Sequence, residues 1–217
     1  MSHIYLDFNA STPLAPEVVE AMRPFLSEHY GNPSSQHWAG RPAREAVESA
    51  REEVAALLGA KTSEIVFTCG GSEANNHAIK GVFFRARTRK PHIITTRVEH
   101  PAVLEPCKFL DKFGASVTLL PVDSTGMVNP DDVRRAISRH TVLISVMHAN
   151  NEVGTIEPIA AIAQIARERS IPLHTDAAQT VGKIAADVRE IGVDLLTVAG
   201  HKLYAPKGVG ALLVRQG

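Results

Sequence analysis

The stretch Ile171-Pro-Leu-His-Thr-Asp176-Ala-Ala-Gln179 places an acid at the end of a short apolar run, and Leu195-Leu-Thr-Val-Ala-Gly-His-Lys202 repeats the arrangement with a lysine. Short apolar runs rich in β-branched residues are typical of strands buried on both faces of a sheet. In open α/β sheets, ligands bind beyond the carboxyl ends of the strands, where polar side chains converge. The two runs therefore predict an α/β fold that brings Asp176 and Lys202 together.

Similar apolar runs recur upstream, with helical patterns between most of them. The expected strands are 65–68, 93–96, 117–120, 142–147, 173–175 and 195–198, and the expected helices are 41–58, 72–87, 101–113, 130–137 and 159–169. Pro101 and Pro130 suit first helical positions, and Gly59 suits a left-handed cap after the first of these helices. Right-handed crossovers then give a mainly parallel sheet sandwiched by helices.

Length and composition fit one enzyme-sized domain with an arm. The chain has 217 residues and no low-complexity linker after about residue 15, so we expect an N-terminal arm at 1–15 and one domain at 16–217.

Basic and acidic residues balance at 23 each, which argues against nucleic acid and anionic membranes as partners. The N-terminus lacks the pattern of a signal peptide and no run has the length of a membrane span, so a cytoplasmic location is expected. Cys69 and Cys107 lack metal-ligand spacing, so no metal site is expected and both are interpreted as packed, reduced thiols.

Polar clusters follow several of the expected strands. Thr68-Cys-Gly-Gly71-Ser72-Glu could cradle a phosphate on free backbone N–H groups, although a tight turn with Ser72 as helix cap explains it equally well. His100 could stack on an aromatic cofactor and move protons, or be an ordinary surface histidine. The Asn150-Asn151 pair could orient a phenolic or carboxylate oxygen, or form a turn.

Asp176 and Lys202 together suggest pyridoxal phosphate (PLP). PLP requires a lysine amine that holds its aldehyde as a Schiff base and a carboxylate that faces its pyridine nitrogen. Taken singly, Asp176 could cap a helix and Lys202 could be a solvated loop residue like Lys207. Several such clusters at the ends of strands are less easily explained by coincidence, so the combination favours a PLP site.

The chain resembles the cysteine desulfurases and selenocysteine lyases of the class V aminotransferase group, which are fold-type-I PLP enzymes, over essentially its whole length. The matching stretches are Tyr5-Leu-Asp-Phe-Asn-Ala-Ser-Thr-Pro13, Gly31-Asn-Pro-Ser-Ser35, Phe67-Thr-Cys-Gly-Gly-Ser-Glu73, Glu99-His100, Asn150-Asn-Glu-Val-Gly154, Asp176-Ala-Ala-Gln179 and Gly200-His-Lys-Leu-Tyr204. This resemblance implies the fold-type-I large domain without its C-terminal small domain.

The resemblance also implies roles for individual residues. Lys202 and His100 would be catalytic, with Lys202 bonded to the cofactor and His100 stacked on its ring. Asp176 would face the pyridine nitrogen. The remaining cofactor contacts would come from Gly71, Ser72, Asn151, Gln179 and His201. Ala199 departs from the family, because many relatives have a phosphate-binding serine or threonine there.

The reaction implied is the removal of sulfur from L-cysteine, which leaves L-alanine and an enzyme persulfide for iron-sulfur cluster assembly or another acceptor. The persulfide cysteine, the arginine that binds the substrate carboxylate and a phosphate contact from a partner subunit have no counterpart in the sequence. A homodimer and a sulfur-acceptor or scaffold protein are the implied partners. Selenocysteine lyase activity and a catalytically silent dimerisation or partner-binding module remain alternatives. A Rossmann dinucleotide enzyme is less compatible, because no Gly-x-Gly-x-x-Gly follows any strand.

Overall fold

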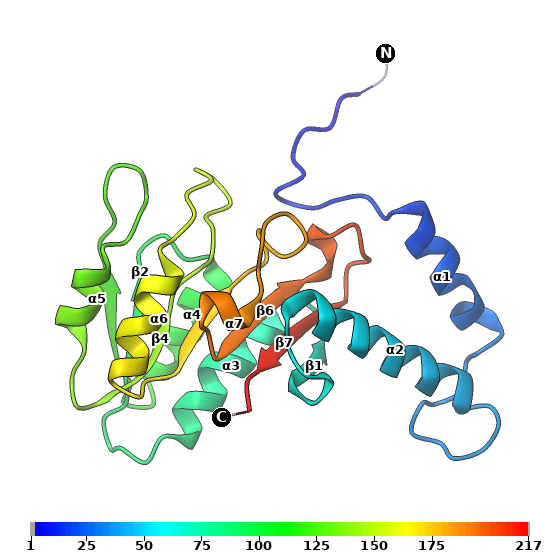
Figure 1. The fold of residues 1–217 in the computed structure, drawn as a ribbon, viewed down its shortest axis with the longest axis horizontal. Helices are drawn as coiled ribbons and strands as arrows, with labels where there is room; N and C mark the ends of the chain where they lie inside the picture. Colours follow the sequence, from blue (N-terminus) through cyan, green and yellow to red (C-terminus); the bar gives the residue numbers. More distant parts are fainter. Residues whose placement is uncertain (1–2, 217) are drawn as a thin grey trace.

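The computed structural model describes residues 3–216, which form a seven-stranded sheet with helices on both faces (Figure 1). The strands are β1 (Ile65–Thr68), β2 (His92–Thr96), β3 (Ser116–Leu120), β4 (Thr141–Ser145), β5 (Leu173–Asp176), β6 (Leu195–Ala199) and β7 (Gly210–Val214). The helices are α1 (Pro16–Ser27), α2 (Arg41–Leu58), α3 (Gly71–Arg85), α4 (Pro101–Asp111), α5 (Pro130–Ala136), α6 (Ile159–Glu168) and α7 (Val188–Ile191), with 3₁₀ turns η1 (Thr62–Glu64) and η2 (Gly200–Lys202).

The strand order is β1-β7-β6-β5-β4-β2-β3, and the block from β6 to β3 is entirely parallel. β7 pairs antiparallel with both β1 and β6, so β1 points the same way as the parallel block. The predicted mainly parallel α/β sheet is therefore confirmed. The loops that follow β1, β2, β4, β5 and β6 consequently leave the sheet at one common edge, which we call the carboxyl edge.

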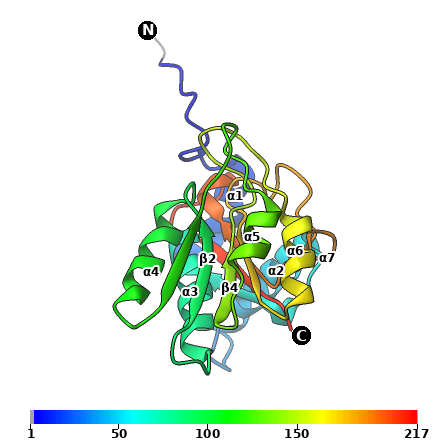
Figure 2. The ribbon, with the colours of Figure 1, turned by 90° about the vertical axis from the view of Figure 1, so that its left-hand side faces the viewer.

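Two apolar cores lie on opposite faces of the sheet. One packs α3 and α4 against the strands, and the other packs α2, α5, α6 and α7. Figure 2 shows these helix layers on either side of β2 and β4. Ile93 faces the first core and its neighbour Ile94 the second, as the alternation of a strand requires. None of the helices in the described part of the chain has the length and apolar character of a membrane span.

Helix limits agree with the sequence patterns. α2 has the predicted bounds, and Gly59 caps it with a φ of 66°. Pro101 and Pro130 open α4 and α5. The expectation that every strand is buried on both faces is wrong for β1 and β3, which contain half-buried and exposed residues because they form the two edges of the sheet. The patterns did not indicate α1, α7 or β7.

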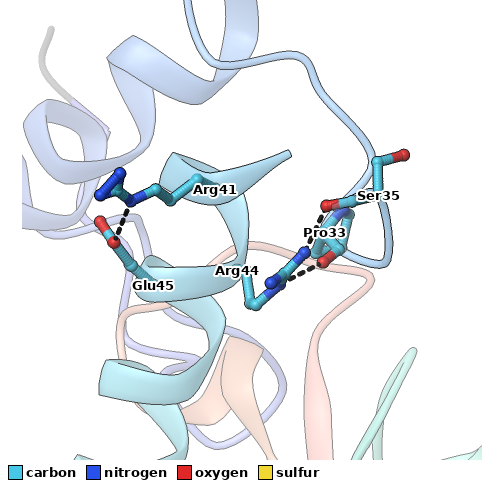
Figure 3. Close-up of polar contacts among 5 residues, drawn as sticks. All are labelled: Pro33, Ser35, Arg41, Arg44 and Glu45. Atoms are coloured by element: carbon cyan, nitrogen blue, oxygen red, sulfur yellow. Dashed lines mark hydrogen bonds and ion pairs between the residues drawn. The ribbon is translucent and has the colours of Figure 1, made fainter. Parts of the chain in front are cut away.

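α1 and the first part of α2 extend away from the sheet, and polar contacts join the loop between them to α2. α1 and α2 project to one side in Figure 1, and no residue of α1 is buried within the described chain. Arg44 on α2 donates hydrogen bonds to the carbonyl oxygens of Pro33 and Ser35, at 2.9 Å for Pro33 (Figure 3). These bonds fix the 31–35 loop to the first turn of α2. Arg41 and Glu45 form an exposed ion pair on the same helix.

Candidate functional site

A cavity of about 690 Å³ lies at the carboxyl edge of the sheet. Every site residue expected from the sequence lines it, although the residues come from five different loops. They are Gly71, Ser72, His100, Asn151, Asp176, Gln179, His201 and Lys202. β3, at one edge of the sheet, contributes no residue to the cavity.

The turn between β1 and α3 forms one wall of the cavity. Gly70 has φ 150° and ψ −179°, a conformation that is essentially restricted to glycine. β7 also passes close to this turn: a Cβ atom added to Gly210 would lie only 2.7 Å from the Gly70 Cα. The first intrahelical backbone bond runs from Ala74 N to Gly70 O, so the amides of Gly71 and Ser72 precede the helical ladder. Such a helix start attracts anions.

Asp176 ends β5 and is buried, with 7% of its surface exposed. Asn75 Nδ2 donates to Asp176 Oδ2 at 2.7 Å, and the Ala178 amide donates to Oδ1 at 3.0 Å. Burial raises the pKa of Asp176, whereas these two hydrogen bonds and the electrostatic effects of the nearby His100 and Lys202 lower it. The carboxylate is therefore held by donors in a site that otherwise disfavours its charge.

Lys202 lies in the 3₁₀ turn η2 directly after β6 and is partly buried. Burial lowers the pKa of Lys202, and the nearby Lys183 lowers it further, against the opposing effect of Asp176 and Asp7. Its amine donates to the carbonyl oxygen of Asn9. Burial also lowers the pKa of His201, with a smaller effect from Lys202. Both groups are thereby shifted toward their neutral forms.

His100 lies in the N-cap position of α4, and its Nδ1 accepts a hydrogen bond from the Ala102 amide at 3.0 Å. The cap role and the cavity position coexist, because Nε2 is not used in the cap. Glu99, the preceding residue, is buried and fixes this loop: its Oε1 accepts from Thr96 Oγ1 and from the Met147 amide, each at 2.9 Å. Burial raises the pKa of Glu99 to about 8.

The N-terminal segment crosses the cavity, which the sequence patterns alone did not indicate. Asn9 O accepts from Gln179 Nε2 at 2.9 Å, and Asn9 Nδ2 donates to Asn151 O at 3.1 Å. Thr12 N donates to His201 O at 2.9 Å. The match of residues 5–13 to the family was the one sequence signal that pointed to this segment. Asn75, three residues after Ser72 on α3, was also missed.

The two cysteines occupy different environments. Cys107 is buried, and burial raises its pKa to about 12. Cys69 is exposed and lines the cavity, so the expectation that both thiols are packed is wrong for Cys69. The turn after β1 carries Cys69 out of the sheet before α3 begins. A hydrogen bond with Glu73 raises the pKa of Cys69, so it too favours the thiol over the nucleophilic thiolate.

The groups present fit PLP. PLP carries an aldehyde, a basic ring nitrogen and a phosphate, and it needs a lysine amine, a carboxylate and an anion-binding turn within reach of one another. Lys202, Asp176 and the start of α3 supply these three groups around a single cavity. The buried Asp176 carboxylate has no cationic side chain bonded to it in the described chain, which suits a protonated ring nitrogen as its partner.

A family model described as Aminotransferase class-V matches residues 4–217. The chain belongs to this family. It is 59% identical to the cysteine desulfurase IscS of Dictyoglomus turgidum and 50% identical to that of Methanosarcina thermophila, each over 99% of this chain. These matches cover 54% and 53% of the relatives, so this class-V family chain spans about half the length of the curated relatives it matches.

Solved structures give the same result for the fold. SspA in complex with cysteine superposes with a TM-score of 0.96 at 47% identity, over 99% of this chain and 62% of that one. A NifS-like protein superposes with a TM-score of 0.96 at 41% identity, over all of this chain and 60% of that one. The predicted resemblance to cysteine desulfurases and the PLP-dependent fold are therefore confirmed.

Proposed function

We propose that the protein is a PLP-dependent cysteine desulfurase that removes sulfur from L-cysteine and leaves L-alanine. The observation that carries this proposal is the convergence of the Lys202 amine, the Asp176 carboxylate and the start of α3 on one cavity. The relatives named cysteine desulfurase support the choice of reaction, and SspA was solved with cysteine. Bound PLP supplies an electron sink that stabilises negative charge at the substrate Cα.

The side chains around the cavity would divide the work of holding the cofactor and the substrate. Lys202 would provide the covalent attachment, Asp176 would keep the ring nitrogen protonated, and His100 would stack on the ring. Gln179 and Asn151 would donate hydrogen bonds to the phenolic oxygen or the substrate carboxylate. The phosphate would be held by Gly71, Ser72 and His201.

Lys202 and His100 are proposed to move protons. The lowered pKa of Lys202 increases the neutral fraction of its amine, so Nζ is able to accept the proton from the substrate Cα. His100 is tied to α4 through Nδ1, which leaves Nε2 for exchange of a second proton near the cavity. The carbonyl oxygen of Asn9 accepts a hydrogen bond from the Lys202 amine and so orients the amine across the cavity.

The sulfur-accepting cysteine is proposed to lie outside these 217 residues, because the raised pKa values of Cys69 and Cys107 suit neither for nucleophilic attack. We assign residues 16–217 to the cofactor-binding large domain of a cytoplasmic homodimer, with residues 1–15 as its arm. A sulfur-acceptor or scaffold protein would receive the persulfide sulfur, for iron-sulfur clusters or another sulfur-transfer pathway.

The same two thiols favour a second candidate: a catalytically silent module that retains the cofactor fold and acts in dimerisation or partner binding. With no suitable thiolate among its own cysteines, such a chain would bind PLP and not release sulfur. A selenocysteine lyase would differ from the first candidate in its substrate. Selenocysteine in place of L-cysteine in the alanine assay below compares the two substrates directly.

The test is L-alanine formation by the chain with PLP, L-cysteine and a thiol reductant, measured beside the Lys202→Ala variant. With the thiol reductant accepting the sulfur in place of the cysteine proposed to lie outside these residues, the desulfurase proposal predicts alanine that depends on Lys202 and persists in Cys69→Ser and Cys107→Ser. PLP binding at Lys202 without alanine would favour the silent module. Failure to bind PLP would contradict both candidates for this chain.

A further inference from the structure

Asn75 extends the site beyond the residues that the family motifs indicate. It lies three residues after Ser72 on α3, a spacing that places two side chains on the same side of a helix. Both side chains line the cavity. One helix thus carries the proposed phosphate contact at its first turn and a second polar group one turn further on.

Asn75 is 1% exposed, and Asp176 is 7% exposed. The bond from Asn75 Nδ2 to Asp176 Oδ2 measures 2.7 Å and joins α3 to the end of β5. The Ala178 amide donates a hydrogen bond to the other carboxylate oxygen, Oδ1. Each oxygen of Asp176 therefore has one N–H donor, an arrangement that favours the charged carboxylate and fixes the plane of the group.

The orientation of the Asn75 amide follows from the same contact. Its oxygen and a carboxylate oxygen would both be acceptors, so the amide nitrogen has to face Asp176. The amide oxygen Oδ1 is then left buried and without a hydrogen-bond partner among residues 3–216. An unpaired buried acceptor destabilises the fold, so the Asn75 side chain is better explained by its bond to Asp176 than by stability.

The surroundings of Asp176 shift its pKa in both directions. Burial raises its pKa, and the Asn75 bond is the largest of the opposing effects, ahead of the Ala178 amide and the electrostatic effects of His100 and Lys202. Glu99 is also close enough to be affected by the Asp176 charge. Without the Asn75 donor, the effect of burial would be offset less fully, and the pKa of Asp176 would rise.

We propose that Asn75 is a positioning residue that holds the Asp176 carboxylate, charged and correctly oriented, toward the cavity. The contact exists in the protein alone. Its consequence for cofactor binding rests on the proposed function, since the carboxylate would then be ready for a protonated ring nitrogen before PLP enters.

The test is an NMR titration of the cofactor-free chain with ¹³C-labelled aspartate, with the Asp176 signal assigned by its loss in Asp176→Asn. In Asn75→Leu, which keeps a similar volume and removes the donor, the Asp176 pKa rises above that of the unmodified chain. Asn76→Leu is the matched control: Asn76 is the next residue of α3 and bonds to the Ser72 carbonyl instead. It leaves the Asp176 pKa unchanged.

The second measurement is PLP affinity. Asn75→Leu weakens PLP binding by about tenfold, the value of one hydrogen bond to a charged group, and Asn76→Leu does not. An unchanged Asp176 pKa in Asn75→Leu would overturn the proposal. Asn75→Ala is measured in the same way if circular dichroism shows that the leucine variant is unfolded. A raised pKa with no PLP binding by any form would contradict the proposed function and leave the role of Asn75 intact.

Discussion

The apolar cores and the carboxyl edge are built on the same strands, but they bury different groups. Leu196 in the core is fully buried among apolar side chains. At the edge, Glu99 and Asn75 are also buried, yet Glu99 Oε2 and Asn75 Oδ1 have no hydrogen-bond partner within the described chain. Unpaired buried polar atoms destabilise a fold. The core therefore buries groups that stabilise the fold, whereas the edge retains buried polar atoms that cost stability.

His174 sharpens the contrast, because it is a polar residue inside the sheet that has its partners. It is fully buried, and its ring nitrogens contact Ser145 Oγ at 2.8 Å and Thr197 Oγ1 at 3.1 Å. Burial lowers its pKa to about 3, so the ring stays neutral at physiological pH. The ring nitrogens of His174 are thus satisfied inside the sheet, whereas Glu99 Oε2 and Asn75 Oδ1 near the carboxyl edge have no partner among residues 3–216.

The largest effect on stability is expected in the core. Leu196→Ala leaves a cavity between β6 and the helices behind it and lowers the free energy of unfolding by about 3 kcal/mol. Leu57→Ala provides the control, because Leu57 is an exposed leucine on α2 and its removal costs about 0.5 kcal/mol or less. Urea denaturation measures both, and equal losses would contradict the description of the core.

A smaller, pH-dependent effect is expected at the edge. The pKa of Glu99 is about 8, against an ordinary value of 4.5. Between these values the folded protein keeps a proton that the unfolded chain has released, so the free energy of unfolding falls as the pH rises. Glu99→Gln removes this dependence, and the unmodified chain loses about 2 kcal/mol more than the variant between about pH 5.5 and 7.5.

The control for Glu99 is Glu105→Gln, which alters an exposed carboxyl group on α4 and leaves the slope unchanged. Urea denaturation at a series of pH values measures the three slopes. If Glu99→Gln and the unmodified chain lose stability in parallel, Glu99 is not the buried acid described here.

The smallest effects on stability are expected on the exposed surface of α2. Arg44→Ala removes two bonds to the 31–35 loop and costs about 1 kcal/mol. Arg41→Ala removes only the ion pair with Glu45 and costs about 0.5 kcal/mol or less. The two exposed arginines lie one turn apart, so thermal unfolding compares them directly. Equal effects would mean that the loop contacts of Arg44 add nothing.

Sequence patterns predicted the parts of the molecule in which local periodicity and burial agree. The period of α2 and the apolar runs of β4, β5 and β6 are of this kind, and the parallel sheet followed from them. β7 was missed, because a short run after a glycine-rich loop gives no sign that it inserts antiparallel between β1 and β6. The edge positions of β1 and β3, which explain their exposure, depend on strand order and not on composition.

The candidate site was predictable where a residue type and a strand end coincide, as for Asp176 and Lys202. Asn75 and Asn9 were not predictable in this way, since both act through long-range contacts. Asn75 reaches a carboxylate 101 residues further along the chain, and Asn9 O contacts Gln179 from 170 residues away. Cys69 was misjudged because free cysteines are usually buried, and only the geometry of the turn after β1 exposes it.

The central claim is that the carboxyl edge binds PLP through Lys202. The most direct measurement is borohydride reduction of the chain mixed with PLP, followed by peptide mass spectrometry. Lys207 lines the same cavity and serves as an internal comparison. The account predicts one stable adduct on Lys202, absent from Lys202→Ala and without transfer to Lys207. Adducts spread over several lysines, or none at all, would contradict it.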